Sequence, residues 1–194
     1  MPWAPGHDFP LLDGHGDPEL APAGVEQAEL VAKRLAGERV DAIYITTLRR
    51  TAQTAAPLAR LTGLTPIVEA DLREVMLGEW EGGVFRQKVA DGHPIALEMF
   101  ATQRWDVIPG AERDELFGER VTAAVNRLAE RHPNERVVAV THGGVIGEVM
   151  GHACGGRRFA FSGSDNCSIS EVVVLGDRWM LRRFNDTVHL GPPA

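Results

Sequence analysis

Cysteine, long apolar runs and positive charge are all scarce in this chain of 194 residues. Its two cysteines, Cys154 and Cys167, are too few for a disulfide framework and lack the spacing of metal ligands. No apolar run approaches the length of a membrane span, and no signal-peptide pattern opens the sequence. A formal net charge of −7 argues against a nucleic-acid-binding surface, although a local pocket can still bind an anion. We therefore expect a cytoplasmic protein that binds neither nucleic acid nor membrane; its oligomeric state stays open.

The remaining composition is that of one globular domain. A hydrophobic fraction of 44% over 194 residues is enough for a single α/β domain with a complete core. Residues 1–22 are rich in proline and glycine and lack periodicity, which predicts an irregular loop at the start of a domain that spans residues 1–194.

Hydrophobic periodicity predicts alternating helices and strands. Apolar residues recur at helical spacing in four segments: 23–35, 49–61 (with Pro57 inside), 114–131 and 145–154. Short apolar or alternating runs predict five strands: 40–45, 66–69, 136–141, 168–175 and 178–184. Residues 75–110 are expected to form an excursion with one or two short helices. This order predicts a three-layer αβα sandwich around a mostly parallel sheet.

A histidine that directly follows an apolar strand is the first sign of chemistry. The predicted strand 136–141 has a continuous apolar run at its centre (137–140), as a parallel strand with both faces covered requires, and His142, Gly143 and Gly144 follow it. Ligands bind at the carboxyl ends of such strands, where glycines let backbone N–H groups approach and a helix N-terminus favours an anion. The pattern predicts a phosphate site; the alternative is a core histidine beside a flexible turn.

Arg50 marks a second place for an oxyanion. It lies near the start of the predicted helix 49–61, directly after another strand. A guanidinium there offers a planar fork of N–H donors together with the positive end of the helix. We interpret the neighbouring Arg49 as part of a solvated basic surface.

Three segments, in this order, resemble the histidine phosphatase superfamily, also called phosphoglycerate-mutase-like. They are Tyr44–Thr54, Leu72–Gly82 and Val140–Gly144. Weaker matches lie at 17–28, 108–112, 166–169 and 185–190, so the resemblance runs from about Asp17 to Leu190. It implies the phosphoglycerate-mutase-like fold, a small phosphorylated metabolite as substrate, and neither a metal nor another cofactor.

The resemblance also implies roles for individual residues. Phosphate would be bound by three of them: Arg50, His142 and Gly143. Glu74 would donate a proton to the leaving oxygen, because an alkoxide leaves poorly and a carboxylic acid with a raised pKa can protonate it. This motif alone favours the alternative that Glu74 is a surface carboxylate that pairs with Arg73; the three motifs in the family's order favour the catalytic role. Substrate binding would involve three further side chains: Thr46, Trp80 and Glu112.

The attacking histidine of the family has no match here. That histidine follows a short apolar strand ending in Arg-His-Gly, and no such strand precedes Met1. His15, within Gly-His-Gly-Asp, echoes the motif, but Pro10 interrupts the segment before it and no arginine precedes it. We therefore expect the first strand of the fold to be missing and the nucleophile to be encoded upstream of the recorded start.

The implied function is a phosphomonoester hydrolase that works through a phosphohistidine intermediate. One alternative is a phosphate-ligand-binding protein without turnover. Another is a phosphotransferase of the phosphoglycerate mutase type; the short region 82–110 favours hydrolysis, because mutases tend to carry a longer insertion there.

Overall fold

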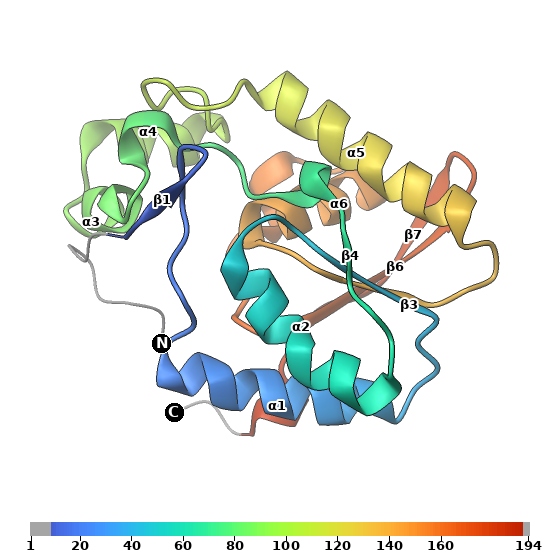
Figure 1. Ribbon diagram of the computed structural model, residues 1–194. Helices are drawn as coiled ribbons and strands as arrows, with labels where there is room; N and C mark the ends of the chain where they lie inside the picture. The colour runs from blue at the N-terminus through green and yellow to red at the C-terminus, as the bar shows by residue number, and fades with distance from the viewer. Residues whose placement is uncertain (1–8, 192–194) are drawn as a thin grey trace.

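The computed structural model describes residues 9–191 as helices packed around β-strands (Figure 1). Three parallel strands lie in the order β4 (Ile67–Val68), β3 (Ala42–Ile45), β5 (Val137–Val140). Two further strands form an antiparallel pair: β6 (Ile169–Leu175) and β7 (Arg178–Asp186). The predicted α/β class with a parallel sheet is confirmed.

Helices cover both faces of the parallel strands. Their bounds are α1 (Pro22–Ala36), α2 (Arg49–Thr62), α5 (Asp114–Arg131) and α6 (Gly143–Cys154). Side chains of β3 alternate between the two layers, because successive residues of a strand point to opposite faces. Ile43 packs with α1 and α2, whereas Tyr44 packs with α5 and α6. Figure 1 shows the resulting three layers.

A small helical excursion stands beside the carboxyl edge of the sheet. Its elements are η2 (Gly78–Trp80), α3 (Val84–Ala90) and α4 (Pro94–Thr102). The preceding turn, η1 (Ala70–Leu72), packs against α5. It has a core of its own, built from Trp80, Ala96, Met99 and Ile108. Two short helical turns lie later in the chain: η3 (Arg158–Phe161) and η4 (Val188–Leu190).

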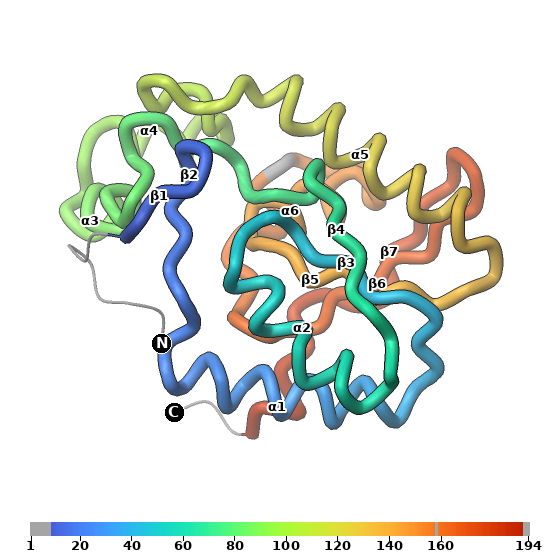
Figure 2. Tube along the Cα trace, in the orientation of Figure 1, coloured from blue at the N-terminus to red at the C-terminus, as the bar shows by residue number. Residues whose placement is uncertain are grey.

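The segment before α1 is more ordered than the predicted loop. A hairpin of β1 (Leu11–Leu12) and β2 (His15–Gly16) turns at Asp13 and Gly14, whose φ angles are 49° and 84°. Such tight turns need two positive φ angles, which glycine and aspartate tolerate. Figure 2 shows this segment running from the excursion to the start of α1. His7 lies outside the described residues.

The strands β5 and β6 face each other without pairing. β5 bonds only to β3, and β6 only to β7, within residues 9–191. A cavity of about 1090 Å³ lies between them and extends along α1, α2 and α6. Ala139 of β5 is therefore exposed, although the sequence predicted a strand buried on both faces.

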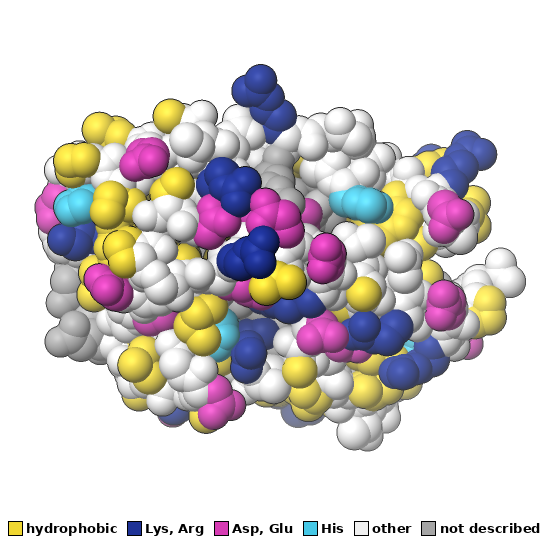
Figure 3. Space-filling model, turned by 90° about the horizontal axis from the view of Figure 1, so that it is seen from above, with side chains coloured by type: hydrophobic (Ala, Val, Ile, Leu, Met, Phe, Trp, Pro, Cys, Tyr) yellow, Lys and Arg dark blue, Asp and Glu magenta, His cyan; other side chains and the backbone are white. Residues whose placement is uncertain are grey.

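Charges of both signs mix on the surface. On the face in Figure 3, basic and acidic side chains are interspersed. The ion pairs that involve residues of α5 include Arg104–Glu115, Arg120–Glu112 and Arg127–Asp71. Among the described helices, none has the length and apolar character that crossing a bilayer would demand.

Candidate active site

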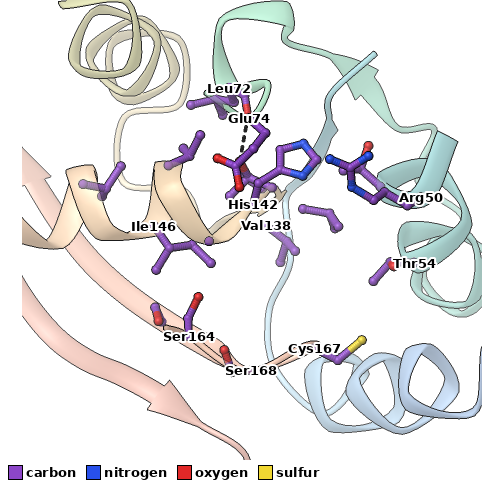
Figure 4. Close-up of a pocket in the computed structure, with 18 of the residues that line it drawn as sticks. Arg50, Thr54, Leu72, Glu74, Val138, His142, Ile146, Ser164, Cys167 and Ser168 are labelled. Carbon is purple, nitrogen blue, oxygen red and sulfur yellow. Dashed lines mark hydrogen bonds between the residues drawn. The ribbon is translucent and has the colours of Figure 1, made fainter. Parts of the chain in front are cut away.

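The three sequence motifs converge at the carboxyl edge of the parallel strands. His142 directly follows β5, and Arg50 lies in the first turn of α2, which follows β3. Glu74 follows η1, and all three side chains line the cavity between β5 and β6. Figure 4 shows the His142 ring between the carboxylate of Glu74 and the guanidinium of Arg50, with Ser164, Cys167 and Ser168 across the cavity.

His142 is held in one orientation by a threonine. Its Nε2 lies 3.0 Å from Oγ1 of Thr46, which in turn lies 3.2 Å from Oγ1 of Thr51. Burial, and then the positive charge of Arg50, lower the pKa of His142 well below its ordinary value. The ring is therefore neutral at neutral pH, and it presents one N–H donor and one acceptor. Thr46 is therefore a partner of His142 and is not among the residues that line the cavity, so a substrate contact for Thr46 stays a prediction.

Glu74 is a carboxyl group set deep beside the N-terminus of α6. Its Oε2 accepts the backbone N–H of Gly144 at 3.2 Å, and its Oε1 accepts that of Val75 at 3.0 Å. Burial raises the pKa of Glu74, against the opposing effect of these hydrogen bonds and of Arg50. A carboxyl group with a raised pKa can hold a proton and deliver it, as a general acid must.

Arg50 supplies the positive charge of the site. One N–H donor, on Nη1, binds the carbonyl oxygen of Gly16 at 2.8 Å, and within residues 9–191 its other donors have no protein partner. Burial lowers the pKa of Arg50, yet a guanidinium remains a cation at physiological pH. Arg50 can therefore bind an anion in the cavity with its remaining donors.

His15 also lies in the cavity wall, although the sequence analysis assigned it no role. Its side chain is only 3% exposed, and its Nδ1 lies 3.6 Å from Oε1 of Glu81. The Glu81 carboxylate also accepts backbone N–H groups of Gly16 and Leu77, each at 2.8 Å. Burial, then the charge of Arg73, lower the pKa of His15. The only sequence signal was the short Gly-His-Gly segment.

The two remaining predicted residues lie in different surroundings. Trp80 is buried, lines the cavity and packs against Phe85. Glu112 is not among the residues that line the cavity; both its oxygens bind Arg120, at 2.7 and 2.8 Å. A substrate contact for Glu112 stays a prediction, and its visible partner is this arginine.

Arg120 is the structural residue that sequence reasoning missed. Its guanidinium donates to three backbone carbonyls of the segment that carries Glu74: those of Asp71, Arg73 and Glu74 itself. A lone arginine inside an amphipathic helix gives no sign of such a clamp, because its partners are main-chain atoms some 46 to 49 residues away.

The arrangement can bind and protonate a phosphate ester. A guanidinium, a neutral imidazole and the N–H groups at the start of α6 attract the oxyanion. A carboxyl group whose pKa is raised by burial, as that of Glu74 is, can donate a proton to a leaving oxygen. Within residues 9–191, no group of three His, Cys, Asp or Glu side chains is arranged to hold a metal ion.

Comparison with known proteins gives consistent matches. The family model described as histidine phosphatase superfamily (branch 1) matches residues 8–187. Phosphoglycerate mutase-like protein 4 of Arabidopsis thaliana is 36% identical over 92% of this chain and 79% of its own length. A metal-independent phosphoserine phosphatase of the same plant is 29% identical over 92% of this chain and 76% of its own. The mycobacterial glucosyl-3-phosphoglycerate phosphatase in complex with VO3 superimposes with a TM-score of 0.79 at 29% identity, covering 91% of this chain and 90% of that one.

Proposed function

Since this chain belongs to the histidine phosphatase superfamily (branch 1), we propose that its site hydrolyses phosphate monoesters of small metabolites through a phosphohistidine intermediate. The observation that carries this proposal is the convergence of Arg50, His142 and Glu74 on one cavity at the carboxyl edge of the strands. Each of these side chains meets a different need of phosphoryl transfer.

Arg50, His142 and the amide of Gly143 bind the phosphoryl oxygens in this proposal. Phosphoryl transfer is catalysed chiefly by positioning the group and by stabilising the charge on its oxygens. A neutral His142 donates one hydrogen bond, and Thr46 fixes the plane of its ring. The guanidinium supplies the charge.

Glu74 protonates the leaving oxygen. In the first step an imidazole nitrogen bonds to phosphorus, the bond from phosphorus to the ester oxygen breaks, and Glu74 gives its proton to that oxygen. In the second step the Glu74 carboxylate takes a proton from water while the water oxygen bonds to phosphorus. The phosphorus–nitrogen bond then breaks, which releases inorganic phosphate and regenerates both groups.

The attacking imidazole is assigned to no histidine of residues 9–191. His142 is occupied by Thr46 and by the phosphate, and His15 sits against Glu81.

Two relatives favour hydrolysis over transfer to a second hydroxyl. The phosphoserine phosphatase and the glucosyl-3-phosphoglycerate phosphatase are both named for hydrolysis. The plant relative with 36% identity is named phosphoglycerate mutase-like, so phosphoryl transfer to a second hydroxyl is our second candidate function. The name of the phosphoserine phosphatase also supports metal-independent action here.

Turnover of p-nitrophenyl phosphate at mildly acidic pH, with and without EDTA, tests the proposal. We expect turnover whose rate is unchanged by EDTA. The substitution Glu74→Gln should lower kcat, and Arg50→Ala should lower mainly kcat/KM. In parallel, the binding of orthovanadate is measured by calorimetry. Vanadate binding that depends on Arg50, without any turnover, would instead identify a phosphate-binding protein. The absence of both vanadate binding and turnover would refute both readings.

A further inference from the structure

We propose that His15 recognises the alcohol part of the substrate and selects phosphate esters whose alcohol part carries a further hydroxyl group. This recognition rests on the phosphate site of the proposed function, because the ester must first be held by its phosphate at Arg50 and His142. Three properties of His15 carry the proposal: its place in the cavity, the anchoring of its hairpin and the chemistry of its ring.

His15 shares the cavity with the phosphate site. His15, Arg50 and His142 all line it, and the carbonyl oxygen of the adjacent Gly16 accepts an N–H of Arg50 at 2.8 Å. Burial and the charge of Arg50 lower the pKa of His142 most, and His15 is the next group whose charge acts on it. The two imidazoles therefore lie within electrostatic range of each other. An ester held by Arg50 and His142 places its alcohol part in a space that His15 borders.

The hairpin that carries His15 is anchored to the helical excursion. The backbone N–H of Phe9 donates to the carbonyl oxygen of Gly82 at 3.0 Å, and that of Gly16 donates to the Glu81 carboxylate at 2.8 Å. A Cβ at residue 16 would stand 3.3 Å from the backbone nitrogen of Gly82, so the two segments are in close contact. The ring of His15 is therefore held in place before any ligand arrives, which lowers the entropic cost of binding.

The His15 ring is a buried polar group available to a ligand. Its side chain is only 3% exposed, and the nearest carboxylate oxygen, Oε1 of Glu81, lies 3.6 Å from its Nδ1. This distance exceeds that of a hydrogen bond, and within residues 9–191 the ring has no hydrogen-bond partner. A buried polar group without such a partner costs free energy. A ligand that forms a hydrogen bond with the ring removes that cost.

The charges around His15 make its Nε2 a hydrogen-bond acceptor. Burial, and then the charge of Arg73, lower the pKa of His15, so the ring is neutral at neutral pH. The Glu81 carboxylate is fixed by the backbone N–H groups of Gly16 and Leu77 and lies nearest to Nδ1, which favours the tautomer with its proton on Nδ1. Nε2 then carries a lone pair. The fitting ligand group is a hydroxyl donor, because a ligand carboxylate would face both this lone pair and the charge of Glu81.

Two matched pairs of phosphate esters test this selection on the full chain. 2-Hydroxyethyl phosphate has a hydroxyl group where n-propyl phosphate has a methyl group, and 3-hydroxypropyl phosphate differs from n-butyl phosphate in the same way. Affinities are measured by calorimetry in Glu74→Gln, in which hydrolysis should be slow, and kcat/KM is measured in the original chain. We expect the hydroxyl ester of at least one pair to be preferred about tenfold, the effect of one hydrogen bond to a buried group.

Two substitutions of His15 separate a ligand contact from a structural role. Glutamine keeps a polar atom near the position of Nε2, whereas asparagine keeps one near Nδ1, which faces Glu81. We expect His15→Gln to retain the preference for the hydroxyl ester and His15→Asn to lose it, while both bind orthovanadate as the original chain does. A ring that only supports the hairpin through Glu81 would give the reverse order. His152→Asn is the control, because His152 is exposed and does not line the cavity.

The other outcomes are equally decisive. Equal affinity within both pairs, no binding of any ester, or a preference that survives His15→Asn would overturn the proposal. So would a preference for 2-carboxyethyl phosphate over both hydroxyl esters that grows as the pH falls below about 6.5, because a protonated His15 would then select acidic esters. A binding preference for the hydroxyl esters without turnover of any ester would support the role of His15 while contradicting hydrolysis as the function of the site.

Discussion

The carboxylate of Glu74 and the backbone of Gly144 are in direct contact. Glu74 accepts the Gly144 N–H at 3.2 Å, and a Cβ at residue 144 would stand 2.5 Å from Oε1 of the same carboxylate. The first turn of α6 therefore holds the proposed acid in place, and only glycine leaves room for it.

We expect Gly144→Ala to displace Glu74 and to lower kcat by tenfold or more, with a loss of stability of about 1–3 kcal/mol from overpacking. Gly143→Ala is the comparison, because its new Cβ would meet only Ser164 Oγ, at 3.7 Å. Steady-state kinetics with an aryl phosphate and urea unfolding measure the two effects. Equal losses in both variants would show that the contact with Glu74 is not what matters.

Thr46→Val should misorient His142. The hydroxyl 3.0 Å from Nε2 is lost while the shape of the side chain is kept. A buried hydrogen bond whose partner is left unsatisfied costs about 1–3 kcal/mol, so we expect vanadate affinity and kcat/KM to fall roughly tenfold or more. Thr46→Ser keeps the hydroxyl and should retain most of the affinity. A valine variant that binds vanadate like the serine variant would contradict the role of Thr46.

Arg120→Lys should loosen the loop that carries Glu74. Lysine cannot reproduce the fork that joins Glu112 to three backbone carbonyls. We expect a loss of about 1.5–3 kcal/mol in the free energy of unfolding, the range for hydrogen bonds to charged groups. Arg127→Lys, at a more exposed ion pair with Asp71, should cost less than about 1 kcal/mol. Urea unfolding midpoints of the two variants are compared. A larger loss in Arg120→Lys would support the role of Arg120 in holding the Glu74 segment, and equal losses would contradict it.

The stability of the chain should fall as the pH drops below about 6.5, the ordinary pKa of histidine. His142 and His15 both have pKa values lowered by burial, so the unfolded chain takes up protons in this range that the folded chain does not. Each histidine contributes at most about 1.4 kcal/mol per pH unit to the slope. Urea midpoints measured between pH 7.5 and 5.5 should change less in His142→Asn than in the original chain. An equal slope in the two proteins would mean that His142 takes up its proton as readily in the folded chain as in the unfolded chain.

Much of the fold follows from local sequence signals. α5 could be bounded at Asp114 and Arg131, because its apolar face is periodic, its first turn is acidic and its last turn is basic. The strands β3 and β5 could also be predicted, because each is an apolar run. The hairpin of His15 was not, since strands of two residues leave no periodicity and its position depends on distant Glu81 and Arg50.

The site was only partly predictable. His142 and Arg50 could be named because each lies where a strand ends and a helix begins, which favours an anion site. Glu74 could be named only through the family resemblance, because a carboxylate in a loop carries no such signal. The partnership of Glu112 with Arg120 could not, because a carboxylate in a loop gives no sign of which cation it will meet. The reduced burial of β5 was also unforeseeable from the residues 136–141, as it depends on what lies beside the strand.

The unpaired edges of β5 and β6 also have a mechanical consequence. Within residues 9–191 no ladder of backbone hydrogen bonds joins the β4–β3–β5 sheet to the β6–β7 pair, so packing of side chains against α5 and α6 holds them together. Packing contacts between side chains are individually weak and break one at a time, whereas the backbone hydrogen bonds between paired strands resist a shearing force together. A pulling force applied across this seam should separate the two sheets first, at a load well below that needed to open either one.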